Sequence, residues 1–182
     1  MKRVILTTVM VTVATASVFA QGTVSVRSGT VHVSNPDGTP VGAGVLGGLL
    51  GAPGSNAPES SLLPGNGVVT FRTGAAGGDL APFTATFNNI APDAAFGSFE
   101  VVAWDNSSGL YPTWLQASAA WEGGVIYAGR STEVTLANIG GPVNPPPVMP
   151  PLSFRIGPIP EPSTAVLMGL GAAALLYVGR RK

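Results

Sequence analysis

The sequence contains no cysteine and only one histidine, His32. The missing thiols exclude disulfides, thiolate catalysis, cysteine-ligated zinc and iron–sulfur clusters. A serine-type triad would depend on His32, yet no G-x-S-x-G motif is present, and a histidine-based metal site needs further histidines or thiols. We therefore expect His32 to be an ordinary strand residue. We expect the protein to have no catalytic activity, cofactor or metal of its own.

Lysine is absent from residues 21–160, where charge is sparse. This part has four arginines against eight acidic residues, a net charge of −4. Nucleic-acid binding requires clustered cations that neutralise phosphates. The charge pattern therefore disfavours a nucleic-acid partner.

The first 20 residues have the layout of a secretory signal peptide. Met1, Lys2 and Arg3 give a positive start, and an apolar run with interspersed Thr and Ser follows to Phe19. Val18 and Ala20 place small or medium residues at the −3 and −1 sites of a cut between Ala20 and Gln21. A retained membrane anchor is the alternative, but the weakly apolar, Thr-rich run favours removal.

After this segment, residues 21–157 show short apolar–polar alternations separated by Gly and Pro turns. This pattern predicts a single all-β, β-sandwich-like domain over 21–157. Val24 and Val26, then Val31 and Val33, alternate with polar residues and predict a hairpin or two successive strands. Residues 99–104 are apolar on both faces and predict a central strand. Further strands are expected at 68–72, 83–87, 125–128, 133–137 and 152–156. Residues 38–67 read as a long loop with a short strand at 45–50, and 114–121 as one or two helical turns.

Two patterns in this region suggest ligands but have simpler explanations. Gly42 to Gly47 satisfy G-x-G-x-x-G, but a dinucleotide site needs a strand before it and a helix after it, which the flanking Pro and Gly residues oppose. Asp37, Asp93, Asp105 and Glu133 supply oxygen ligands of the kind calcium prefers, without an EF-hand spacing. Capping of backbone amides in turns is the more ordinary role of such acids.

The chain closes with Pro-Glu-Pro, an uncharged segment and three basic residues. Residues 163–179 would span about 25 Å as a helix, slightly less than the roughly 30 Å hydrocarbon core of a bilayer. Pro162 suits a helix start, and basic residues remain on the cytoplasmic side. We expect a transmembrane helix at 163–179 whose tail, Arg180, Arg181 and Lys182, fixes its orientation, within a C-terminal unit at 158–182.

Residues 160–182 resemble a PEP-CTERM sorting signal, with the motif Pro160, Glu161, Pro162, Ser163 and Thr164 before the apolar segment and basic tail. The resemblance implies a transient stay in the inner membrane of a Gram-negative-type bacterium, with exosortase as the partner that cuts near the motif. The body would then reach the cell surface or an exopolysaccharide-containing matrix. Residues 71–76, 101–105 and 152–154 also resemble PEP-CTERM proteins of Verrucomicrobia-like bacteria, which implies no particular activity.

Aromatic residues gather in the second half of the body. Trp104 lies in the best strand and is expected in the core, whereas Tyr111 and Trp114 fall in an expected loop, where flat rings could contact a glycan. A carbohydrate-binding module of the exopolysaccharide matrix is therefore the alternative to an exported protein without a ligand. A secreted hydrolase is the third class, disfavoured by the missing nucleophile motif.

Overall fold

The computed structural model describes residues 21–159. The predicted signal peptide, the sorting motif, the helix at 163–179 and the basic tail lie outside these residues. Within the described part, no helix is both long enough and apolar enough to cross a membrane.

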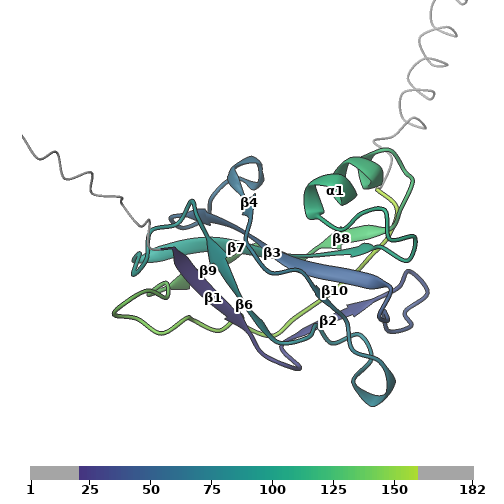
Figure 1. Cartoon of the computed structure of the whole chain (residues 1–182), viewed down its shortest axis with the longest axis horizontal. Helices are drawn as coiled ribbons and strands as arrows, with labels where there is room; N and C mark the ends of the chain where they lie inside the picture. The colour runs from purple at the N-terminus through teal and green to yellow at the C-terminus, as the bar shows by residue number, and fades with distance from the viewer. Residues whose placement is uncertain (1–20, 160–182) are drawn as a thin grey trace, which may run out of the picture.

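Two long antiparallel strands form the centre of the fold. They are β3 (Val45–Pro53) and β7 (Phe96–Asp105), which pair along the whole of β3. β3 also pairs with the short strands β4 (Leu63–Pro64) and β5 (Val69–Thr70), and β7 with β8 (Ala128–Arg130) and β9 (Val134–Ala137). Together they make a six-stranded sheet (Figure 1).

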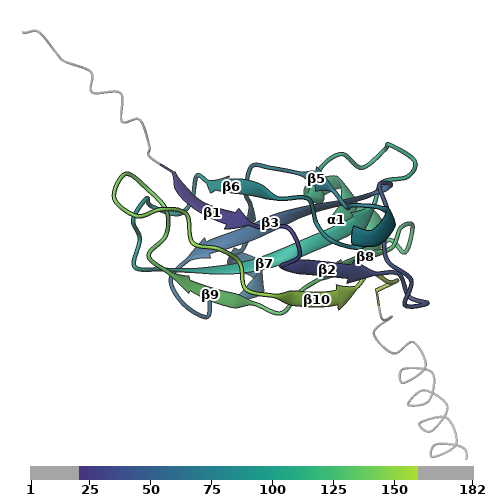
Figure 2. The same cartoon turned by 90° about the horizontal axis from the view of Figure 1, so that it is seen from below.

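Two smaller sheets form a second layer. β1 (Gly22–Val26) pairs antiparallel with β6 (Phe83–Phe87), and β2 (Val31–Ser34) pairs parallel with β10 (Leu152–Arg155). β1 and β2 are thus successive strands, and the hairpin alternative is wrong. Figure 2 shows β1 and β6 beside β2 and β10.

The main core lies between these layers. The four alternating valines of β1 and β2 are at most 1% exposed and pack in one cluster with Phe87, Phe99 and Val101. The predicted all-β class is confirmed, and two layers around one core are consistent with a β-sandwich-like body.

Isolated bridges join the two layers at their edges. Phe71 bridges Leu80, His32 bridges Asp79, and Ala128 bridges Gly157 in antiparallel fashion. The last of these joins β8 to the chain that follows β10, with backbone hydrogen bonds of 2.9 and 3.2 Å. Covered edges leave fewer unpaired backbone groups for aggregation.

The largest difference between the predicted and the observed strands concerns β3. A short strand was predicted at 45–50 within a long loop, whereas β3 continues to Pro53 and is paired along its whole length with β7. A Cβ at Gly51 would lie 2.7 Å from the Phe87 ring and 2.8 Å from the Phe99 ring. Gly51 therefore makes room for core side chains, which is one reason glycine occurs inside a strand.

Other boundaries shift by a few residues. The strand expected at 68–72 is only two residues long, and the one expected at 125–128 begins at Ala128 after a loop. The strands expected at 133–137 and 152–156 appear as β9 and β10. Two short 3₁₀ turns, η1 (Glu59–Ser61) and η2 (Gly74–Ala76), lie in the loops.

The helix α1 (Trp114–Glu122) covers part of the outer face of the six-stranded sheet (Figure 1). The Thr113 hydroxyl accepts a hydrogen bond from the Gln116 N–H at 3.4 Å, so Thr113 caps the first turn. Buried Trp114 and Ala117 pack on this face with Val102 and Trp104 in a second, smaller core. The helix is thus held by a tryptophan-rich interface.

Candidate functional site

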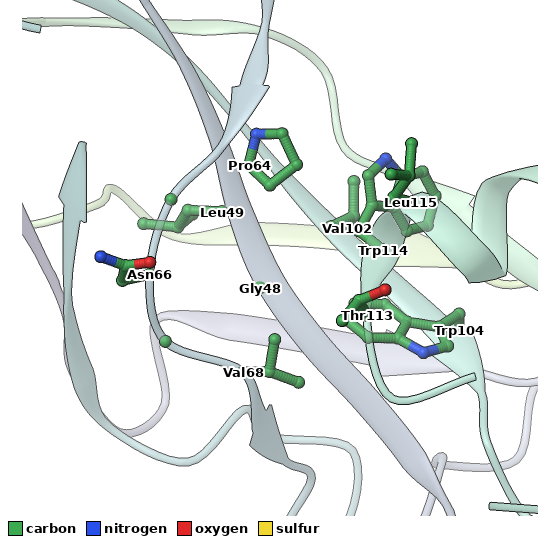
Figure 3. Close-up of a pocket in the computed structure, with 12 residues that line it drawn as sticks. Gly48, Leu49, Pro64, Asn66, Val68, Val102, Trp104, Thr113, Trp114 and Leu115 are labelled. Carbon is green, nitrogen blue, oxygen red and sulfur yellow. The ribbon is translucent and has the colours of Figure 1, made fainter. Parts of the chain in front are cut away.

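A groove of about 350 Å³ opens on the outer face of the sheet beside the start of α1. Its floor is formed by Gly48, Val102 and Trp104 of the central strands. One wall is the segment 64–68, and the other is the segment 113–115 (Figure 3). Most of the lining is apolar, with the Thr113 hydroxyl as a polar group at the rim. The Asn66 amide donates instead to the Thr86 hydroxyl at 3.2 Å, and its side chain points away from the groove (Figure 3). Such a composition is typical of ligand sites, in which few polar groups orient an apolar body.

The groove exists because residue 48 has no side chain. A Cβ at Gly48 would meet the Gly67 carbonyl oxygen at 3.5 Å and the Trp104 ring at 3.9 Å. Both distances are ordinary contacts, so a small side chain fits and would fill the floor. This makes Gly48 the natural position at which to block the groove.

Three tryptophans pack in a row where α1 meets the sheet, Trp104 of β7 and Trp114 and Trp121 of α1. The ring centroids of Trp104 and Trp114 are 5.6 Å apart, and those of Trp114 and Trp121 are 6.2 Å apart. The Trp104 indole N–H donates to the Tyr111 carbonyl at 2.7 Å, and that of Trp121 donates to the Gly157 carbonyl at 2.8 Å. Buried indoles usually find such acceptors, so this row is well fixed.

The prediction that Trp104 lies in the core is confirmed, since it is fully buried. The expected loop placement of Trp114 is wrong, because the loop ends at Thr113 and Trp114 is the first residue of α1, only 7% exposed. Tyr111 stays in the loop and is half-buried. Glycan contact through these two residues remains a prediction, and Trp114 could contribute only where it lines the groove.

Arg130 on β8 packs over the ring of Trp114. Its guanidinium carbon lies 5.2 Å from the Trp114 ring centroid, within cation–π range. One guanidinium nitrogen lies 2.6 Å from Glu59 Oε1 and 3.7 Å from Glu100 Oε2. Arg130 thus joins η1, β7 and α1, an arrangement that the sequence interpretation did not find. A single acid inside the apolar strand 99–104 was the signal that could have pointed to a buried partner.

Glu100 is 8% exposed, and its burial raises the pKa of the carboxyl above the ordinary value of 4.5. The positive charge of Arg130 opposes this rise, whereas the negative charges of Glu59 and Glu133 add to it. Glu100 Oε2, Arg130 Nε and Glu133 Oε1 are buried without a hydrogen-bond partner among residues 21–159. The cluster therefore holds one arginine among more carboxylates than it can pair.

The remaining candidate residues lie apart from the groove and from each other. Asp37 accepts hydrogen bonds from the Thr39 hydroxyl at 2.7 Å and its N–H at 2.9 Å, which lower the pKa of Asp37. Asp93 accepts from the Asn144 N–H at 2.7 Å, and Asp105 from the Ser107 N–H at 2.8 Å. These acids cap backbone amides in turns. In the described part of the chain, no group of three or more His, Cys, Asp or Glu residues could hold a metal ion.

Two further sequence patterns have structural roles. The Nδ1 atom of His32, on β2, lies 3.1 Å from Asp79 Oδ1 at the edge between the layers. Gly42 to Gly47 lead from a turn directly into β3, with no helix after them. The glycine pattern therefore lacks the strand–loop–helix setting of a dinucleotide site.

Comparison with known proteins adds one finding, at the end of the chain. Residues 158–182 match the family model of the PEP-CTERM protein-sorting motif. No curated protein and no solved structure matches the chain. The motif implies export, processing at the membrane, and exosortase as the processing partner, so the chain carries the sorting signal of an exosortase substrate.

Proposed function

We propose that this is an exported cell-envelope or extracellular-matrix protein whose body has no catalytic activity of its own. The signal peptide at 1–20 directs export and is removed before Gln21. The segment 163–179 then holds the chain in the inner membrane, with Arg180, Arg181 and Lys182 on the cytoplasmic side. Exosortase recognises Pro160, Glu161 and Pro162, cuts nearby, and passes the body to the cell surface or matrix.

The junction between body and sorting signal supports this proposal most directly. Gly157 makes the last backbone pairing of the body, with Ala128, and the sorting match begins at the next residue, Pro158. The last strand pairing of the described body therefore lies just before the segment that exosortase would remove. Charge also agrees, since the body carries a net −4 while basic residues cluster at the two termini of the chain.

The test replaces Pro160, Glu161 and Pro162 with alanines in a host that has exosortase. We expect the variant to stay full-length in the membrane fraction while the wild-type protein is shortened and released. The same pair in a host without exosortase is the control, and there both proteins should remain in the membrane. Equal release of variant and wild type in the first host would contradict the sorting role.

Carbohydrate binding is a second candidate, favoured by the groove beside α1. A volume of about 350 Å³ has room for a sugar ring. The exposed edge of Trp114, 7% of the residue, and the Thr113 hydroxyl could contact the sugar. The partner would be the host's exopolysaccharide.

Blocking the groove tests this candidate without damaging the core. Gly48→Val should abolish binding of the processed protein to the host polysaccharide in a titration. Gly42→Val is the matched control, because a Cβ at Gly42 meets nothing within 4 Å. Equal binding by wild type and Gly48→Val would exclude the groove, and no binding by the wild type would exclude the function.

A further inference from the structure

We infer that the end of the body formed by the loops 105–111 and 123–127 docks on the lipid bilayer while the protein is anchored. Three exposed apolar residues, Leu110, Val125 and Tyr127, form the contact and are called here the exit patch. The inference rests on the proposed anchoring by 163–179. It adds the orientation of the body and the surface that faces the lipid.

The point at which the chain leaves the body is fixed beside this patch. Gly157 exchanges both backbone hydrogen bonds with Ala128, and its carbonyl also accepts from the Trp121 indole. Ala128 directly follows the loop that contains Val125 and Tyr127. Figure 2 shows the yellow-green segment after β10 at the α1 end of the body, opposite the end at which β1 begins.

The tether from this exit to the membrane segment is short. Ser163, the first residue of the uncharged segment, comes only six positions after Gly157. Even a fully extended chain of that length reaches only about 20 Å. The α1 end therefore stays close to the bilayer throughout anchoring, whereas the opposite end of the body is held away from it.

The exit patch has the composition that the bilayer interface favours. Leu110 is 68% exposed, Val125 is 66% exposed and Tyr127 is 49% exposed. Leu110 and Val125 line one surface hollow together with Tyr111 and Ile126, so the two loops lie side by side. Amphipathic aromatic side chains such as those of Tyr111, Trp121 and Tyr127 are enriched at headgroup depth. Covering this apolar surface with lipid would remove it from water, which lowers the free energy.

The charges at this end limit how deeply it can enter. Asp105 lines the same hollow, and Glu122 is exposed at the end of α1. Carboxylates are costly in hydrocarbon, so the contact is shallow, with the loops in the headgroup region. The partner is a lipid surface that the side chains enter by a few ångströms, as amphipathic elements do.

The absence of cysteine allows a direct test with single-cysteine labels. The protein is isolated from inner membranes of a host without exosortase and placed in vesicles of phosphatidylethanolamine and phosphatidylglycerol that carry a lipid-bound quencher. Val125→Cys reports the exit patch, and Val143→Cys is its matched control. Val143 is 83% exposed and belongs to the loop between β9 and β10, which turns at the opposite end of the body (Figure 2). We expect at least about twofold stronger quenching at 125 than at 143. Adding Leu110→Ser should reduce the quenching at 125.

A third label, Ala172→Cys, separates this inference from the proposed function. Strong quenching at 172 with equal, weak quenching at 125 and 143 would overturn the docking while leaving the anchoring intact. Protein that does not float with the vesicles, or a label at 172 that is not quenched, would overturn both.

Discussion

The two faces of the sheet made by β3 and β7 differ in what covers them. The inner face packs against valines and phenylalanines of the second layer, and its buried side chains are apolar. The outer face packs against α1 through tryptophans and also holds Glu100 and Arg130. The inner face is therefore a continuous apolar core, whereas the outer face accepts polar groups and leaves a groove.

The inner face should be the most sensitive to truncation. Phe99 is fully buried, and its ring meets that of Phe87 edge-on with centroids 5.2 Å apart. Phe99→Ala should lower the free energy of unfolding by about 3–5 kcal/mol, because it leaves a cavity in a rigid core. Urea denaturation followed by tryptophan fluorescence measures the loss. A loss below that of any outer-face variant would reverse the comparison.

On the outer face, the largest effect should come from the arginine that joins three elements. Arg130→Ala removes the partner of buried Glu100 and the cation above Trp114, and should cost about 2–3 kcal/mol. Adding Glu100→Gln should recover part of this loss, because the neutral amide needs no counter-charge. Failure of the second change to recover stability would indicate that Arg130 acts through packing alone.

Gly47 and Gly48 are adjacent in β3 and face opposite sides of the sheet, so substitutions at these two positions compare the two faces directly. A Cβ at Gly47 would lie 2.5 Å from Leu80 Cδ1 and 3.0 Å from the Phe71 ring in the inner core, whereas one at Gly48 meets only ordinary contacts. Gly47→Ala should cost about 1–2 kcal/mol through overpacking. Gly48→Ala should be neutral or stabilise by up to about 1 kcal/mol, since alanine restricts the unfolded chain. Thermal unfolding of both variants gives the comparison, and equal shifts would contradict it.

The smallest expected effect depends on pH. Because the pKa of Glu100 is raised in the folded protein, the folded state binds that proton more tightly than the unfolded state. The contribution of Glu100 to stability is therefore most favourable below pH 4.5 and declines as the pH rises through the folded pKa. Glu100→Gln should thus stabilise the protein more at neutral pH than below pH 4.5, measured by urea denaturation across this range. A pH-independent difference would show that Glu100 is ionised with an ordinary pKa.

Much of the inner face could be predicted from the sequence, and much of the outer face could not. Alternation placed Val24, Val26, Val31 and Val33 correctly because a strand with one buried face repeats every two residues. The same rule failed for β3, where glycines serve the packing of side chains from other strands. It also cannot reveal that β2 pairs with β10, since that partner lies more than 100 residues further along the chain.

The candidate site was predicted only in part. Aromatic enrichment pointed to Tyr111 and Trp114, and Trp114 does line the groove. Contacts between β3, β7, β8 and α1 determine three features of the site. They are the burial of Trp114, the lack of a side chain at Gly48 in the floor of the groove, and the packing of Arg130 on the Trp114 ring. Short-range sequence patterns do not indicate contacts between segments that are far apart in the chain. The sorting motif is different, because its order and terminal position are properties of the sequence itself.

The pairing of Gly157 with Ala128 bears on how well the processed protein would resist exopeptidases. The first strand starts at Gly22, whose N–H already donates to the Ile90 carbonyl at 2.9 Å. Trimming before Gln21 and near Pro160 would thus leave almost no loose chain at either terminus. Exopeptidases in the surrounding medium could then remove only a few residues before they reached a hydrogen-bonded strand, which must open before it can be cleaved. Short unpaired termini would thus protect from proteolysis a protein that has no disulfides.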